Sequence, residues 1–316
     1  MIVKILKNVS GFPGVRYNTN KVDHHQGELM RVSGFGSLQG LQNMRPQDYI
    51  NYLKLVSSTN SRIEKPQFHA VISGKGRTYT KEELTEIGRL WMEQMGYGAQ
   101  PYLAVFHKDT ANNHIHLVTT RVGKDGKKIN SAYERFRAVN SMDHVLGYEL
   151  ALQYNLSTKA QFYLVLECGG YLGRDYNEAK LAAHLARYQP DKIRMMQLRS
   201  LLIAHKDDAG YSQMLMERYQ VQLVFHAAEG KAPYGYTILD HDTKQVFKGS
   251  EVLPLKYLGS ALNDQVVAAN HSGQAENEPF LPATYIGPVW IADDVDDEAI
   301  LGVKRRRKQK ARTNTR

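Results

Sequence analysis

Three histidines lie close together between two apolar runs in the first half of the chain. They are His107, His114 and His116, spaced as H-x6-H-x-H. The apolar residues around them predict a strand, a short turn and a second strand over about 101–122. Side chains two residues apart on a strand share a face, and the paired strand can bring His107 beside the other two. The spacing therefore predicts a metal site on a hairpin, with coordination positions left open.

A metal ion that is held by neutral imidazoles keeps its positive charge and acts as a Lewis acid. Imidazole favours Mn, Co, Ni, Cu or Zn over Mg on affinity, but Mg2+ can serve where a substrate phosphate supplies oxygens. We therefore expect a divalent metal cofactor, Mg2+ or Mn2+, with other transition metals as alternatives. The competing interpretation is that the histidines are structural.

The composition is that of an ordinary globular protein of 316 residues with a single cysteine, Cys168. One cysteine excludes a disulfide framework and a cysteine-based zinc site, and fits a reducing compartment. No apolar stretch approaches the roughly 18 residues of a membrane-spanning helix, so no membrane insertion is expected. The first residues predict a strand rather than a signal peptide. We expect a cytoplasmic protein.

Most of the net charge of +9 lies at the C-terminus. Residues 304–316 hold eight basic side chains and no acidic one, which leaves about +1 for residues 1–303. Basic tails bind phosphate backbones without sequence specificity. The alternative is a solvated terminus without a specific partner. The tail residues that we expect to contact DNA are Lys304, Arg305, Arg306, Arg307 and Lys308.

The elements of the first half predict an α+β fold, an antiparallel sheet with helices packed on one face. Residues 20–44 show no clear period and predict a loop or a weakly helical flap. Thr80 and Glu83 form a capping box at the start of a helix. A later helix is expected to turn Phe136, Val139, Met142, Leu146 and Leu150 toward the core. Strands are predicted over 2–6, 68–73 and the hairpin, and helices over 46–57, 80–95 and 133–154.

The second half predicts a smaller α+β module followed by a weakly patterned end. Helical patterns cover 176–188, 190–205 and about 211–219, and short strands are predicted over 221–227, 236–240 and 245–248. Prolines and an acidic cluster mark the residues after about 264. We expect three parts: residues 1–158, a helical and β module over 159–264, and a largely disordered linker and basic tail over 265–316.

Tyr17 follows the first predicted strand and is flanked by Arg16 and Asn18. A tyrosine can attack phosphorus if a nearby group accepts its proton and if the negative charge that develops during the attack is stabilised. A nearby metal or arginine would lower its ordinary pKa of about 10. The alternative is an ordinary half-buried aromatic, since the chain has 19 tyrosines.

Together these segments resemble the mobilisation relaxases of bacterial plasmids and conjugative elements, which are DNA-nicking transesterases of the HUH type. The resemblance covers about residues 1–155. It rests on the early tyrosine, F-H-A-V-I-S, the T-x-E-E-L helix start and H-x-D-x-x-N-x-H-I-H-L-V. Residues 211–250 also resemble the module that often follows this domain in Bacteroides-type mobilisation proteins.

The resemblance implies a role for each matching residue. The three histidines would bind the metal and Tyr17 would be the nucleophile, with no second tyrosine before Tyr49. Asp109 and Asn112 would fix the hairpin turn or orient the imidazoles. Arg16 would hold the DNA backbone. Additional site candidates are His69 on a neighbouring strand and the group Asp23, His24 and His25 beyond Tyr17.

The implied activity is nicking of one strand at a transfer origin, with a 5′-phosphotyrosine link and resealing after transfer. The implied partners are single-stranded origin DNA, accessory mobilisation proteins and a type IV coupling protein in the bacterial cytoplasm. A replication initiator or transposase of the HUH type would use the same site. Two further alternatives are a three-histidine metalloenzyme that acts on a small molecule and a non-catalytic nucleic-acid-binding protein.

Overall fold

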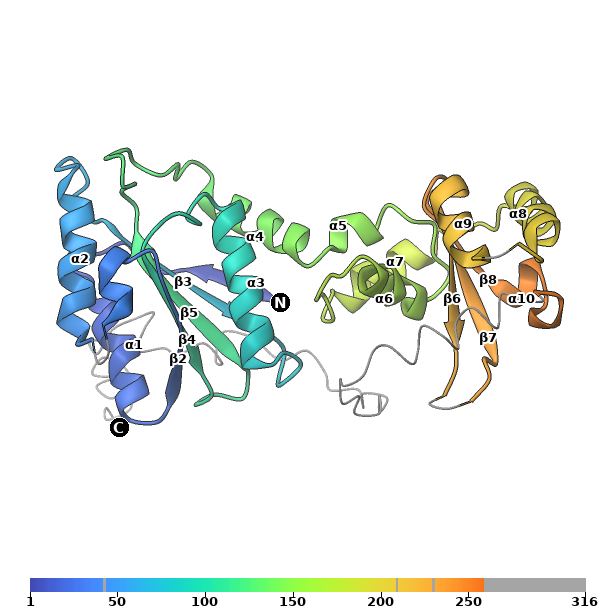
Figure 1. Ribbon diagram of the computed structural model, residues 1–316. Helices are drawn as coiled ribbons and strands as arrows, with labels where there is room; N and C mark the ends of the chain where they lie inside the picture. The colour runs from blue at the N-terminus through green and yellow to red at the C-terminus, as the bar shows by residue number, and fades with distance from the viewer. Residues whose placement is uncertain (42–43, 209, 229–230, 259–316) are drawn as a thin grey trace, which may run out of the picture. The chain divides into compact units, whose positions relative to one another are not determined.

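The computed structural model describes residues 1–258 except 42–43, 209 and 229–230 (Figure 1). The expected linker and basic tail over 265–316, with Lys304 and its neighbours, lie outside the described residues. The described part forms two compact units, Met1–Gly147 with Tyr171–Tyr176, and Tyr148–Gly170 with the described residues from Asn177 onward. The first unit contains a five-stranded sheet and the second a three-stranded sheet.

The sheet of the first unit is antiparallel throughout, as the sequence predicts. Its strand order is β1-β3-β5-β4-β2, and the expected hairpin, β4 and β5, lies at its centre (Figure 1). In this hairpin His107 pairs with His114, and Val105 pairs with His116. The strands are β1 (Ile2–Ile5), β2 (Gly27–Ser33), β3 (Gln67–Ser73), β4 (Tyr102–His107) and β5 (His114–Thr120).

Helices cover both faces of this sheet, so the expectation of helices on one face is wrong. Val118 packs with Phe12 near α1 and α2, whereas Leu117 approaches Gly88 of α3 on the opposite face. Every residue of β3, β4 and β5 is buried, which is typical of strands with both faces covered. The helices are α1 (Pro13–Asp23), α2 (Pro46–Ser58), α3 (Lys81–Gln94) and α4 (Glu134–Val145).

The segment around Tyr17 is helical, and the expected loop over 20–44 is wrong. Helix α1 runs to Asp23, β2 follows, and a 3-10 helix covers Gly36–Gly40. The buried face of α1 includes Asn18 and Thr19, whose side chains donate hydrogen bonds to the carbonyl oxygens of Gly14 (2.7 Å) and Val15 (3.0 Å). Because these buried residues are polar, the helix shows no clear apolar period. A register shift in β2 likewise disturbs its alternation.

The predicted helix over 133–154 is broken and partly misoriented. Helix α4 ends at Val145, Gly147 follows with a positive φ of 76°, and α5 covers Tyr148–Ala151. Phe136 and Val139 are 68% and 51% exposed, so their expected inward direction is wrong. The Arg121–Glu134 ion pair (2.6 Å) fixes the start of α4, where Ala138 is buried instead, whereas Met142 and Leu146 are buried as predicted.

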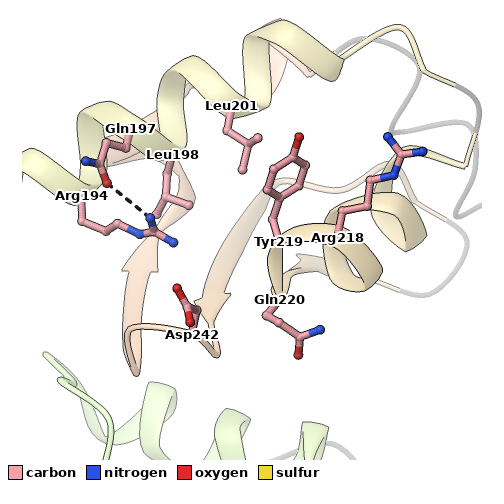
Figure 2. Close-up of a pocket in the computed structure, with 8 residues that line it drawn as sticks. All are labelled: Arg194, Gln197, Leu198, Leu201, Arg218, Tyr219, Gln220 and Asp242. Carbon is pink, nitrogen blue, oxygen red and sulfur yellow. Dashed lines mark hydrogen bonds between the residues drawn. The ribbon is translucent and has the colours of Figure 1, made fainter.

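The second unit confirms the predicted helices and strands and adds α6 and α10, which the sequence did not suggest. Its sheet has the order β6-β7-β8. A pocket of about 450 Å3 is lined partly by Arg194, Tyr219 and Asp242 (Figure 2). Arg194 is held by the buried carboxylate of Asp240 at 2.6 Å. The elements are α6 (Lys159–Cys168), α7 (Glu178–Leu185), α8 (Lys192–His205), α9 (Tyr211–Tyr219), β6 (Val221–His226), β7 (Gly235–Asp240), β8 (Gln245–Lys248) and α10 (Gly249–Val252).

None of the helices in the described part of the chain has the length and apolar character needed to cross a bilayer.

Candidate functional site

The three hairpin histidines converge on the face of the sheet that α1 covers. One ring nitrogen from each of His107, His114 and His116 can be chosen so that all three atoms lie within 4.8 Å of one another. All three side chains are buried, and the ring centroids of His107 and His116 are 4.2 Å apart. The register of the hairpin produces this cluster, because it places His107 opposite His114. The histidines are thus placed to bind a metal ion.

Burial keeps these imidazoles neutral, which is the form that binds a metal. It lowers the pKa of His107 to about 3, helped by the neighbouring His114. Burial is also the main cause of the lowered pKa of His114. It lowers the pKa of His116 well below its ordinary value. At neutral pH the site therefore presents uncharged nitrogen ligands.

Several polar atoms that face this site lack a hydrogen-bond partner among the described residues. They include both ring nitrogens of His107 and the Nε2 atoms of His114 and His116. Buried polar atoms without partners are uncommon in folded proteins and costly to keep. A divalent cation would use the lone pair of one nitrogen from each ring, so the residues fit such an ion. An all-imidazole set favours a transition metal over Mg2+ on affinity.

Tyr17 lies on α1 and faces the histidines. Its ring centroid is 5.9 Å from that of His107 and 5.8 Å from that of His116. Its hydroxyl oxygen is buried and has no hydrogen-bond partner among the described residues. Val15 and Phe12, both fully buried, anchor the start of this helix in the core. The structure therefore brings Tyr17 and the three histidines together.

Lys21 is a site residue that the sequence reasoning missed. Its Nζ lies 5.9 Å from the centroid of the Tyr17 ring and 2.8 Å from Oδ2 of Asp109. Tyr17 and Lys21 are four residues apart, so they share a face of α1 once that helix is recognised. Burial is the largest single effect on the Asp109 carboxyl and raises its pKa. The hydrogen bond and the positive charge of Lys21, together with the electrostatic effects of His107 and His114, lower the pKa below its ordinary value.

The two hairpin-turn residues have separate contacts. Asp109 accepts its hydrogen bond from Lys21 and thereby joins the turn to α1. The side chain of Asn112 accepts a hydrogen bond from the backbone N–H of Gly76. The backbone oxygen of Asn112 lies 3.1 Å from Nδ1 of His114. Asn112 thus contacts one imidazole through its main chain, and its side chain connects the turn to the end of β3.

His69 lies behind the histidine cluster, on β3. It is 5% exposed, and its Nε2 is 2.8 Å from Nδ1 of His116 and 3.5 Å from Nδ2 of Asn18. Burial lowers its pKa to about 3. Because both rings are neutral, one nitrogen of the close pair donates and the other accepts. This contact can orient the ring of His116 so that its Nε2 faces the other ligands.

The remaining candidates lie at the surface. Asp23, His24 and His25 are exposed at the C-terminal end of α1, and Nδ1 of His24 is 2.7 Å from the carbonyl oxygen of Asn20 in the same helix. Arg16 is exposed and donates a hydrogen bond to the side chain of Gln47. The structure does not bring these four side chains into the histidine cluster.

We expect the His69→Phe substitution to weaken metal affinity about 10–100-fold, since it removes the hydrogen bond to His116 but keeps a ring of similar size. Titration calorimetry with Mn2+ measures the effect. His69→Gln should restore much of the affinity, because an amide can replace the hydrogen bond. His24→Ala, at an exposed position, is the control. Equal affinities for the wild-type and His69→Phe proteins, both folded, would show that His69 does not position the ligand.

Residues 17–146 match the family model described as relaxase, MobA/VirD2-like, nuclease domain. The matched region begins at Tyr17 and includes His69 and the three hairpin histidines. No curated protein and no solved structure matches the chain. The match confirms the resemblance seen in the sequence motifs.

Proposed function

Because the first unit of this chain contains a MobA/VirD2-like relaxase nuclease domain, we propose that it nicks one DNA strand by tyrosine transesterification. We further propose that the target is a transfer origin and that the reaction serves mobilisation of a plasmid or conjugative element. One observation carries the proposal: Tyr17, whose hydroxyl is buried, has its ring within 5.9 Å of His107 and His116, two of the three neutral histidines that can hold a metal ion.

In the proposed reaction the Tyr17 oxygen forms a bond to phosphorus as the bond from phosphorus to the 3′ oxygen breaks. The tyrosine proton leaves to an acceptor, and the departing 3′ oxygen takes up a proton to become a 3′-OH. The products are a 5′-phosphotyrosine link and a free 3′-OH. A later 3′-OH can attack the link and release Tyr17, so the strand is resealed without ATP.

The residues around Tyr17 divide the remaining tasks. His107, His114 and His116 would hold the divalent ion, Mg2+ or Mn2+, with His69 behind His116. When bound, the ion would supply Lewis-acid stabilisation of charge on the non-bridging phosphate oxygens. Lys21 places a positive charge 5.9 Å from the Tyr17 ring, where it favours the phenolate form as the proton leaves. Arg16, exposed on the same helix, would contact the DNA backbone.

The proposal is tested by incubating the purified chain with supercoiled plasmid that carries its cognate transfer origin, with Mn2+ or Mg2+ and with EDTA. We expect conversion to open circles that depends on the metal and leaves protein bound covalently to one strand. An intact plasmid under all conditions would contradict the proposal and favour a small-molecule metalloenzyme or a non-catalytic DNA-binding protein. Cleavage of a replication origin or transposon end instead would favour the initiator or transposase alternative.

Single-stranded origin DNA, accessory mobilisation proteins and a type IV coupling protein are the proposed partners. The basic tail should add contacts to DNA. Deletion of residues 304–316 is expected to weaken non-specific DNA binding and to flatten its salt dependence, because fewer phosphates are neutralised. Fluorescence anisotropy over a salt series measures the slope. A tail with its basic residues replaced by glutamine is the matched control and should behave as the deletion does. An unchanged slope would show that the tail does not contact DNA.

A further inference from the structure

Two aromatic rings and a valine are exposed on the outer side of α4 and the residue before it. Tyr133 is 86% exposed, Phe136 68% and Val139 51%. Residues three apart lie near one another on a helix, so these side chains share one side of α4. We call them the Tyr133 face. An exposed apolar group of this kind on a globular domain often marks a binding surface.

The Tyr133 face is held in place by buried contacts. The backbone of Tyr133 has a φ of 48°, in the left-handed region that is uncommon for residues other than glycine. Its neighbour Glu134 accepts hydrogen bonds from both terminal nitrogens of the buried Arg121, at 2.6 and 2.8 Å. Arg137 donates to the carbonyl oxygens of Asn130 (2.9 Å) and Met95 (3.1 Å). These contacts fix the start of α4, so the two rings point outward from a firmly held backbone.

The chain segment that leads into and carries the Tyr133 face is basic. Residues 124–139 contain five basic and two acidic side chains, a net charge of +3. One of the two acids, Glu134, is paired with Arg121, and the other, Asp125, lies 3.7 Å from Lys127. Lys124, Lys128 and Arg135 are exposed. The exposed rings therefore belong to a segment of the chain with a net positive charge.

We propose that the Tyr133 face binds single-stranded DNA, with bases stacked on Tyr133 and Phe136 and phosphates near Lys124, Lys128 and Arg135. Sequence-tolerant binding of single strands combines aromatic stacking with positive charge in this way. A protein partner is the weaker choice, because charged side chains are depleted at the cores of protein interfaces. The identity of the strand as DNA rests on the proposed function.

This contact would be separate from the nicking site. Helix α4 packs against β1 and α3, whereas Tyr17 lies on α1, over the other face of the sheet (Figure 1). A strand that spans only the scissile phosphate should therefore not need the Tyr133 face. A longer strand should gain affinity by reaching it. The affinity for single-stranded DNA should therefore increase with the length of the strand.

The test compares the wild-type chain with the double variant Tyr133→Ala/Phe136→Ala on oligothymidylates of increasing length, by fluorescence anisotropy at fixed salt. We expect the variant to bind the longest strands at least about tenfold more weakly and the shortest strands equally well. Leu55→Ala is the matched control, because Leu55 is also strongly exposed (66%) but lies on α2. Circular dichroism confirms that the variants are folded.

If the double variant and the wild-type chain bound oligothymidylates of every length with equal affinity, the inference would be overturned. The Tyr133 face would then be assigned to binding a protein partner. A similar loss in Leu55→Ala would also overturn it. Binding is measured without strand cleavage, so this outcome does not depend on nicking. Absence of metal-dependent nicking by the wild-type chain counts against the proposed function. A Tyr133→Ala/Phe136→Ala variant that nicks normally and binds strands of every length as tightly as the wild-type chain counts against this inference alone.

Discussion

Tyr17→Phe is expected to abolish strand cleavage and the covalent protein–DNA adduct, with a rate loss of at least about 10³-fold. The substitution removes only the hydroxyl oxygen and keeps the ring that lies beside His107 and His116. That oxygen has no hydrogen-bond partner among the described residues, so its loss should cost little stability. The measurement is a gel assay for nicked product and adduct, beside anisotropy for DNA binding.

Tyr49→Phe is the matched control, because Tyr49 is the next tyrosine in the chain and is buried in the core beside α1. It should nick normally. Cleavage and adduct at wild-type levels in Tyr17→Phe would show that another residue is the nucleophile. Equal loss of cleavage in both variants would point to a general structural effect instead.

His114→Ala and His116→Ala are each expected to abolish nicking, with DNA binding largely intact. Each substitution removes one of three nitrogens that lie within 4.8 Å of one another, and three ligands are needed to hold the ion firmly. Metal affinity, measured by calorimetry with Mn2+, should fall below detection. Anisotropy with single-stranded DNA should change little, because both side chains are buried.

His24→Ala serves again as the control, since His24 is exposed and its ring contacts its own helix. It should bind Mn2+ and nick as the wild-type chain does. If His116→Ala bound Mn2+ normally, the histidine cluster would not be the metal site. If it lost DNA binding together with nicking, the separation between metal and DNA contacts would be wrong.

The histidine cluster could be predicted from sequence because its geometry is local. His107, His114 and His116 lie on one hairpin, and the alternation of a strand fixes their directions. The capping box of Thr80 and Glu83 is local in the same way, and the structure has it at the start of α3. Short-range rules were sufficient for these features.

The helix that carries Tyr17 could not be predicted in this way. Its buried residues Asn18 and Thr19 are polar and donate hydrogen bonds within the helix, so no apolar period marks it. Without the helix, Lys21 had no visible relation to Tyr17. The direction of Phe136 was missed for a related reason, because the Arg121–Glu134 ion pair sets the rotation of α4 and has no local signal.

The central claim is that Tyr17 is the residue that becomes joined to DNA. Mass spectrometry of the proteolysed adduct, formed with origin DNA and Mn2+ and trimmed by nuclease, tests it most directly. The account predicts a nucleotide remnant on the peptide that contains Tyr17 and an unmodified peptide in the Tyr17→Phe variant. A remnant on any other residue, or cleaved DNA without a covalent peptide, would contradict it.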